Sequence, residues 1–136
     1  MKLSLFLIVA TLYQLTAQAE ILDLVQQQVD AFNKRDIERL TENVSADFTW
    51  YSVSNDSSWV ELSGKENFRH AMISYFESRN YQITSSIHSY IISGNRLSFE
   101  EWVEHRNAAW QIVRSSALAI YQMNDGKIER AWYFVE

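Results

Sequence analysis

The sequence predicts a single α+β domain in which helices come first and a run of long strands follows. Apolar residues recur every three or four positions along residues 21–33 and 65–79, which is the spacing of an amphipathic helix. From residue 82 onwards, segments rich in aromatic and β-branched residues alternate with turn signals such as Ser93-Gly94-Asn95. This order indicates three helices packed against a curved antiparallel sheet.

The helical part of the chain also contains one strand. Its expected elements are helices over residues 21–33, 37–44 and 65–79, a strand over residues 48–53 and a polar loop over residues 54–63. Asp36 precedes the second helix and has a side chain suited to an N-cap. The apolar stripe of the third helix consists of Phe68, Met72, Tyr75 and Phe76.

Four further strands are expected at residues 82–92, 97–105, 110–122 and 128–136. The last two are joined by the Asp125-Gly126 turn. Asp and Gly tolerate the positive φ angles of a two-residue hairpin, so this pair is a strong local signal. The closing aromatic segment is therefore expected to complete a sheet.

Residues 1–19 have the pattern of a secretory signal peptide. Lys2 supplies a positive start, residues 3–15 are mostly apolar, and Ala17-Gln18-Ala19 is a small-x-small cleavage site. The alternative is a retained anchor, although the apolar run is shorter than the roughly 20 residues that a membrane span needs. We expect cleavage after Ala19, a mature domain over residues 20–136 with no stable membrane anchor, and a secreted or periplasmic location.

The composition narrows the possible functions. The net charge of −5 and the absence of a basic stripe argue against nucleic acid as a partner. With no cysteine, the chain has no thiolate nucleophile or Cys-ligated zinc. It contains no His-x-x-x-His motif or clustered carboxylates either, so neither a metal site nor a cofactor is expected.

Four short segments, in order along the chain, resemble landmarks of the nuclear transport factor 2-like superfamily, in its SnoaL-like and ketosteroid-isomerase-like branch. They are A-F-N-K-R-D-I-E at residues 31–38, A-D-F-T-W at 46–50, S-G-K-E-N-F at 63–68, and D-G-K-I with its following W-Y at 125–133. The resemblance implies a cone-shaped barrel of a curved antiparallel sheet with three N-terminal helices. It also implies a pocket inside the cone and a homodimer formed through the convex sheet face.

The resemblance does not carry over the catalytic groups of the family. Isomerases of this superfamily use an acid on the first strand, a Tyr on the first helix and an acid on the penultimate strand. Matched by position, these fall on Ser52, Gln28 and Ala119, none of which has the required group. The helix Asp of the family's dehydratases falls near Asn33. Steroid-isomerase chemistry by that mechanism is therefore not expected.

The alternation of side chains along the strands gives a different candidate. Glu101 shares a strand face with Leu97, Phe99 and Val103, so an inward orientation would surround its carboxyl with apolar groups and raise its pKa. Such a carboxyl can act as a general acid or base; the alternatives are that Glu101 is solvated or that it pairs with Arg106 or Arg114. His105 lies on the same face at the rim, and His88 could approach Glu101 from the neighbouring strand.

These observations lead to two hypotheses. The first is an exported domain that binds a small apolar or aromatic molecule and catalyses cofactor-free proton transfer, isomerisation or hydration; the second is a non-catalytic binding or interaction module of the same fold. The catalytic candidates are Glu101, His88 and Tyr133. The candidates for binding the molecule are Trp50, Ser52, Gln28, Met72, Phe76, Ala119, Tyr121 and His105.

Overall fold

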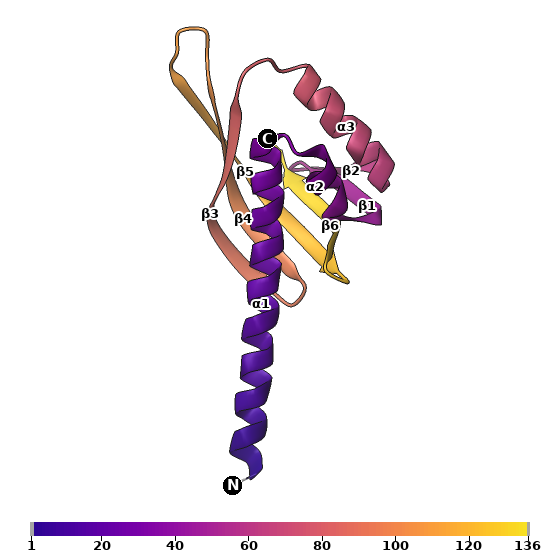
Figure 1. The fold of residues 1–136 in the computed structure, drawn as a ribbon, viewed down its shortest axis with the longest axis vertical. Helices are drawn as coiled ribbons and strands as arrows, with labels where there is room; N and C mark the ends of the chain where they lie inside the picture. The colour runs from indigo at the N-terminus through magenta and orange to yellow at the C-terminus, as the bar shows by residue number, and fades with distance from the viewer. Residues whose placement is uncertain (1, 136) are drawn as a thin grey trace.

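The computed structural model describes residues 2–135, and side chains from residue 9 onwards (Figure 1). Its helices are α1 (Lys2–Lys34), α2 (Ile37–Glu42) and α3 (Lys65–Glu77). Its strands are β1 (Val44–Val53), β2 (Ser58–Ser63), β3 (Ile83–Ser93), β4 (Arg96–Arg106), β5 (Ile112–Asn124) and β6 (Lys127–Phe134). The predicted α+β class is confirmed, and the predicted helices and strands occur in the expected order with one additional strand, β2.

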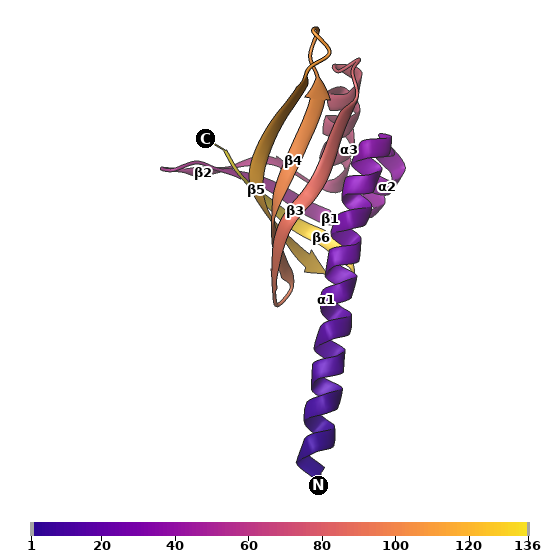
Figure 2. The ribbon, with the colours of Figure 1, turned by 90° about the vertical axis from the view of Figure 1, so that its left-hand side faces the viewer.

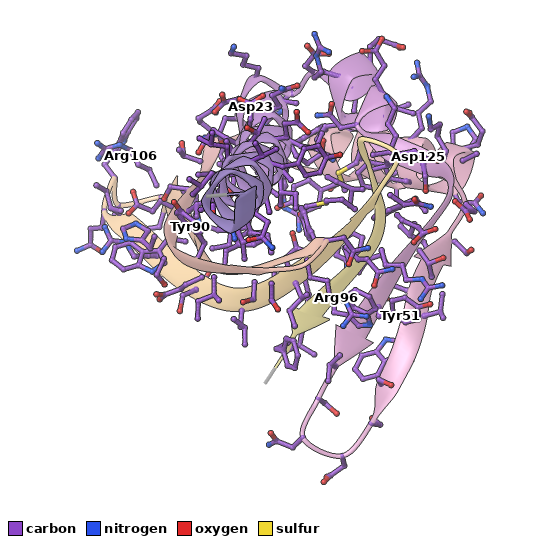
Figure 3. All side chains as sticks on the ribbon, turned by 90° about the horizontal axis from the view of Figure 1, so that it is seen from below. Asp23, Tyr51, Tyr90, Arg96, Arg106 and Asp125 are labelled. Atoms are coloured by element: carbon purple, nitrogen blue, oxygen red, sulfur yellow. The ribbon has the colours of Figure 1, made fainter. Side chains whose placement is uncertain are left out.

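The six strands form one open sheet in the order β2-β1-β6-β5-β4-β3. Neighbouring strands run antiparallel except β1 and β6, which are parallel, so the expectation of a wholly antiparallel sheet is corrected at this pair. The sheet curves around the helices, and Figure 3 shows Arg106 and Tyr51 toward opposite ends of this curve. This open, curved sheet with helices on its concave side is the expected cone.

The predicted turns and caps follow their local chemistry. Asp36 caps α2 by accepting a hydrogen bond from the backbone N–H of Arg39 at 3.0 Å. Asp125 and Gly126 have φ angles of 49° and 71°, which is the geometry of the predicted hairpin turn. Both predictions are confirmed.

Most element boundaries shift by one to four residues from expectation, and two differences on either side of β1 change the fold locally. The predicted helix over residues 37–44 ends at Glu42, and Val44 already begins β1. The predicted loop over residues 54–63 contains the edge strand β2, which pairs with β1 through positions such as Trp59 opposite Ser52. Because one edge of β2 and much of its surface face solvent, its sequence lacks the apolar alternation of a half-buried strand.

The first helix is much longer than the predicted segment over residues 21–33. Its N-terminal half extends away from the domain (Figures 1 and 2), and Val9 and Tyr13 are 61% and 80% exposed. The buried part begins near Val25, where the helix meets the concave side of the sheet. No helix within residues 2–135 is both long and apolar enough to span a membrane.

The core lies between the concave sheet face and the helices. Leu97 and Phe99 of β4 and Val25 of α1 are at most 1% exposed. Phe48 of β1 meets Phe68 of α3 edge to face, with ring centroids 5.0 Å apart. The helices and the sheet therefore share one hydrophobic core, and the cavity described next lies within it.

Candidate functional site

A cavity of about 180 Å³ lies between the concave sheet face and the helices α1 and α3. Helix α1 contributes Gln28, Val29 and Phe32, and α3 contributes Phe68, Met72 and Tyr75. The sheet side includes Trp50, Glu101, Val103, Tyr121, Ala131 and Tyr133. A mostly apolar wall with a few polar groups is typical of a small-molecule site.

Glu101 is the only charged side chain among the described residues that line this cavity. It lies in the middle of β4, where its backbone is in register with Ile87 on β3 and Ala117 on β5. The predicted face assignment is confirmed, since Leu97 and Phe99 are buried and Val103 lines the same cavity. The alternation of β4 therefore places a carboxyl group in an apolar interior.

Two hydroxyl groups hold the Glu101 carboxyl. The Oγ of Ser85 donates to Oε1 of Glu101, and Tyr133 also forms a hydrogen bond to this carboxyl group. Burial raises the pKa of Glu101 above its ordinary value, and the bonds from Ser85 and Tyr133 oppose this rise. Glu101 is thus a carboxyl whose charge is stabilised by neutral donors instead of a cation.

Tyr121 extends this arrangement into a chain of hydroxyls. The phenol oxygens of Tyr121 and Tyr133 are 2.6 Å apart. Because Tyr133 has one proton and gives it to ionised Glu101, it must accept the proton of Tyr121. Burial raises the pKa of both phenols, and the nearby Glu101 charge adds to the effect. Both phenols therefore stay neutral while Glu101 titrates.

His88 does not join this group, which corrects the expectation that it could approach Glu101. Its ring is exposed and stacks on Trp102, with centroids 3.2 Å apart and planes at 17°. Opposed residues of paired strands share a face, and Glu101 is opposite Ile87, so the adjacent His88 points to the other side. A register shift between Ile87 and Ser89 places His88 at a bulge.

His105 also lies away from the cavity, which corrects its expected place at the rim. It packs against Tyr81 with ring centroids 5.3 Å apart. Both residues line a separate outer hollow that includes Trp110 at the β4–β5 turn. The alternation along β4 predicted the strand face of His105 correctly. This end of β4, however, extends beyond the part of the sheet that lines the cavity.

The remaining predicted binding residues divide into two groups. Trp50, Gln28, Met72 and Tyr121 line the cavity. Ser52, Phe76 and Ala119 are buried but are not among its lining residues, so direct contact of these three with a bound molecule is not supported.

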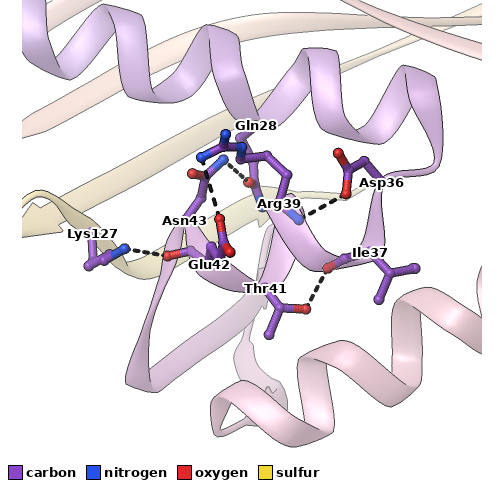
Figure 4. Close-up of polar contacts among 8 residues, drawn as sticks. All are labelled: Gln28, Asp36, Ile37, Arg39, Thr41, Glu42, Asn43 and Lys127. Carbon is purple, nitrogen blue, oxygen red and sulfur yellow. Dashed lines mark hydrogen bonds and ion pairs between the residues drawn. The ribbon is translucent and has the colours of Figure 1, made fainter.

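Gln28 lines the cavity, but its amide is engaged elsewhere. Its Oε1 accepts from Nδ2 of Asn43 at 2.9 Å, as Figure 4 shows. Its Nε2 donates to the backbone carbonyl of Leu40 at 3.4 Å. Gln28 therefore ties α1 to the end of α2 and offers the cavity mainly its aliphatic part.

Ser85 is the polar contact that the sequence reading missed. It is 2% exposed and lies between Ile83 and Ile87 in the alternation of β3, on the face that meets Glu101. The signal available in the sequence was a serine that shares a strand face with an isoleucine two positions before it and another two positions after it. Within residues 2–135, no group of three His, Asp or Glu side chains is arranged to hold a metal ion.

Comparison with known proteins agrees with this architecture. The family model of the SnoaL-like domain matches residues 25–131. No curated protein sequence matches the chain significantly.

Solved structures give the same fold at low sequence identity. An LEH-like epoxide hydrolase of M. tuberculosis has a TM-score of 0.69 at 14% identity, over 87% of this chain and 84% of that one. A cystatin-fold protein from Novosphingobium aromaticivorans has a TM-score of 0.67 at 18% identity, over 83% and 96%. A protein described as a SnoaL-like polyketide cyclase, from Jannaschia sp. CCS1, has a TM-score of 0.67 at 12% identity, over 85% of each chain. The chain belongs to the SnoaL-like domain family, within the nuclear transport factor 2-like superfamily.

Proposed function

We propose that this protein binds a small apolar molecule in the cavity and catalyses a cofactor-free proton transfer on it, with Glu101 as the general base and acid. The observation that carries the proposal is the Glu101 carboxyl, which lines an apolar cavity and has only hydroxyl donors as partners among the described side chains. The SnoaL-like family and the polyketide cyclases among the structural neighbours support a role in small-molecule binding or catalysis.

The chemistry follows from the raised pKa of Glu101. A buried carboxylate accepts a proton more readily than a solvated one, so it can remove a proton from a weakly acidic C–H group and return it at another position. This sequence of steps is an isomerisation and consumes no cofactor. Hydration is the related outcome when the proton comes from a water molecule. Tyr133 donates to the carboxylate, which orients it for either route and partly offsets the rise in its pKa.

The cavity volume limits the size of the molecule. A cavity of about 150 Å³ in another protein holds benzene, and the cavity here is about 180 Å³. We therefore propose a molecule with one or two rings. The aromatic side chains Phe32, Trp50 and Tyr75 on the cavity wall favour a flat or unsaturated ring.

A graded ligand screen tests the binding half of the proposal. Thermal-shift measurements would compare cyclohexenone, indole and naphthol with a four-ring steroid. Stabilisation by the one- and two-ring compounds, with none by the steroid, is expected. Met72→Trp, which fills the cavity from α3, should remove the effect. The absence of stabilisation by any compound of one or two rings would contradict the binding proposal.

Glu101→Gln tests the catalytic half. The amide keeps the shape of the side chain but cannot accept a proton, so turnover of a molecule that binds should fall by a factor of 10² or more. Glu100→Gln, on the opposite face of the same strand, is the matched control and should leave turnover unchanged. Unchanged turnover in Glu101→Gln would exclude Glu101 as the base.

A non-catalytic binding module is the second candidate. The residues at the three positions that carry the family's catalytic groups favour this function. Ser52 and Ala119 do not line the cavity, and the amide of Gln28 is already bonded to Asn43. Under this reading, Glu101→Gln changes ligand affinity, and no compound that binds is converted. Mass spectrometry of each bound compound after incubation distinguishes the two functions.

We also propose that the protein is exported and cleaved between Ala19 and Glu20. The exposed apolar helix over residues 9–19, which extends away from the domain, supports this proposal. The intact mass of protein recovered from a secreting host should correspond to residues 20–136. Recovery of the uncleaved chain would contradict it.

A homodimer through the convex sheet face is a further part of the proposal. Leu118 and Phe134 lie opposite one another on β5 and β6 and are 48% and 39% exposed, which supports an interface there. Sedimentation of the wild type should give a dimer and that of Leu118→Glu a monomer. A monomeric wild type at micromolar concentration would rule out this interface.

A further inference from the structure

We infer that Asn33 and Ser85 are positioning residues that hold the Glu101 carboxyl in place through a relay from helix α1. The side-chain amide of Asn33 binds the backbone of Ser85, and the hydroxyl of Ser85 binds Glu101. This inference rests on the proposed function, because positioning matters for activity only if Glu101 is the reacting group.

The first step of the relay is the contact between Asn33 and the edge of the sheet. Ser85 lies on β3, which has no neighbouring strand on its outer side. Nδ2 of Asn33 donates to the carbonyl of Ser85 at 2.9 Å, and the N–H of Ser85 donates to Oδ1 of Asn33 at 2.7 Å. The amide thus takes the place of a missing strand at this one residue. An amide side chain has its donor and its acceptor on two neighbouring atoms, so it can bond the C=O and the N–H of one residue at the same time.

The second step is the fixed direction of the Ser85 side chain. Ser85 is 2% exposed, Asn33 binds both its N–H and its C=O at the outer edge, and Ser85 lies in register with Val103 of β4. Its Oγ donates to Oε1 of Glu101. Edge strands open more easily than central ones, so an unpinned β3 would let this hydroxyl move away from the carboxylate.

The relay acts on an otherwise neutral environment. The titratable groups facing Glu101 from the packed elements are Tyr75 on α3, Tyr121 on β5 and Tyr133 on β6, and burial raises the pKa of all three. None of them changes charge while a carboxyl titrates. A change in the Glu101 midpoint therefore reports on its hydrogen bonds.

The experiment is an NMR titration of the full chain labelled with ¹³C at the glutamate carboxyl groups, with Glu101→Gln used to assign the signal. It needs no ligand, so its outcome is independent of the proposed function. Ser85→Ala removes a donor that favours the charged form, and should raise the Glu101 midpoint by about one pH unit. Ser85→Thr keeps the hydroxyl and should restore the wild-type midpoint. Ser86→Ala, on the opposite face of β3, should leave it unchanged.

Asn33→Ala distinguishes a relay from a general effect on folding. It should raise the midpoint in the wild-type background and have no effect in the Ser85→Ala background, because Asn33 acts only through that hydroxyl. An equal shift in both backgrounds, or an unchanged midpoint in Ser85→Ala, would overturn the inference.

Hydrogen exchange in the unmodified protein gives a second test that requires no variant to fold. The Ser85 amide proton should exchange slowly, although it points away from the sheet, because Asn33 holds it. Rapid exchange at Ser85 would also overturn the relay.

Discussion

Two consecutive glutamates on β4 lie on opposite faces of the sheet and have different partners. Glu100 is on the convex face, where its Oε1 accepts a hydrogen bond from Nε1 of Trp102 at 2.7 Å. The same face carries an ion pair, in which Nε of Arg114 is 2.6 Å from Oε1 of Glu104. Glu101, on the concave face, is bonded by the hydroxyls of Ser85 and Tyr133, and burial raises its pKa.

The difference shows which of the two carboxyls, Glu101, is not explained by the stability of the fold. On the convex face, the carboxyl groups have an indole N–H or an arginine as partner and are partly accessible to solvent, which is the usual way to place acids on a sheet. On the concave face, a carboxyl without a counter-ion lowers the stability of the fold, and a leucine there would fill the space at no such cost. Costs of this kind are typical of functional sites.

The largest expected effect is the difference in lost stability between a buried position on the concave face and an exposed position on the convex face. Leu97, on the concave face, is fully buried, so Leu97→Ala should lower the free energy of unfolding by about 2–5 kcal/mol. Ile91 is 73% exposed on the adjacent strand, and Ile91→Ala should cost less than about 1 kcal/mol. Urea denaturation measures both. Similar losses at the two positions would mean that the faces are not distinguished by packing.

How much of this arrangement could be predicted from the sequence depends on whether the strands stay regular. The inward orientation of Glu101 followed from simple alternation with Leu97 and Phe99, since β4 pairs with β5 without a register shift. The Asp125-Gly126 turn was predictable for a local reason, because the required φ angles restrict the residues.

The wrong or missing predictions concern features that are determined by tertiary contacts. The bulge near His88 cannot be seen in a single strand, since it is a property of the pairing between β3 and β4. The contact between Asn33 and Ser85 joins residues 52 positions apart, and no local pattern predicts it. The edge strand β2 lacks a buried face, so its sequence reads as a loop.

The next effect concerns the hydroxyl chain on the concave face. Tyr133→Phe removes the donor to Glu101 and leaves the Tyr121 hydroxyl without its partner, so it should lower stability by about 1.5 kcal/mol. The Glu101 midpoint should also rise. Tyr51→Phe, on the convex face where Tyr51 stacks on Trp132, should change stability by less than about 0.5 kcal/mol. Equal losses in the two variants would argue against a special role for the chain.

A smaller effect with the opposite sign is expected at Glu101 itself. Its pKa in the folded state is raised above the ordinary value of 4.5, so the folded protein binds the proton more tightly than the unfolded chain. The stability that this provides is fully present below pH 4.5 and is lost as the pH rises through the folded-state pKa. The amide in Glu101→Gln cannot ionise, so this variant does not lose that stability as the pH rises. It should be more stable than wild type at pH 8 by about 1 kcal/mol.

The control for this pH dependence is the neighbouring glutamate. Unfolding curves of wild type, Glu101→Gln and Glu100→Gln would be compared at pH 4 and pH 8. Only Glu101→Gln should gain stability relative to wild type between the two pH values. A variant that is less stable than wild type at pH 8 would show that the charged carboxyl stabilises the fold, and the proposed functional cost would be wrong.

The smallest effect is expected at the ion pair of the convex face. The side chains of Arg114 and Glu104 are 51% and 32% exposed, so solvent screens their attraction and Arg114→Ala should cost less than about 1 kcal/mol. Part of that cost comes from the Arg114 guanidinium, which lies 4.0 Å from the centre of the Trp102 ring. The ionic part should shrink between 0.05 and 1 M salt, because about 1 M salt reduces the screening length to about 3 Å. Arg96→Ala loses a bond to the neutral side chain of Gln122 and should show no such salt dependence. If the cost of Arg114→Ala were instead large and insensitive to salt, the convex face would hold a desolvated charge as the concave face does, and burial of a carboxyl would no longer single out Glu101.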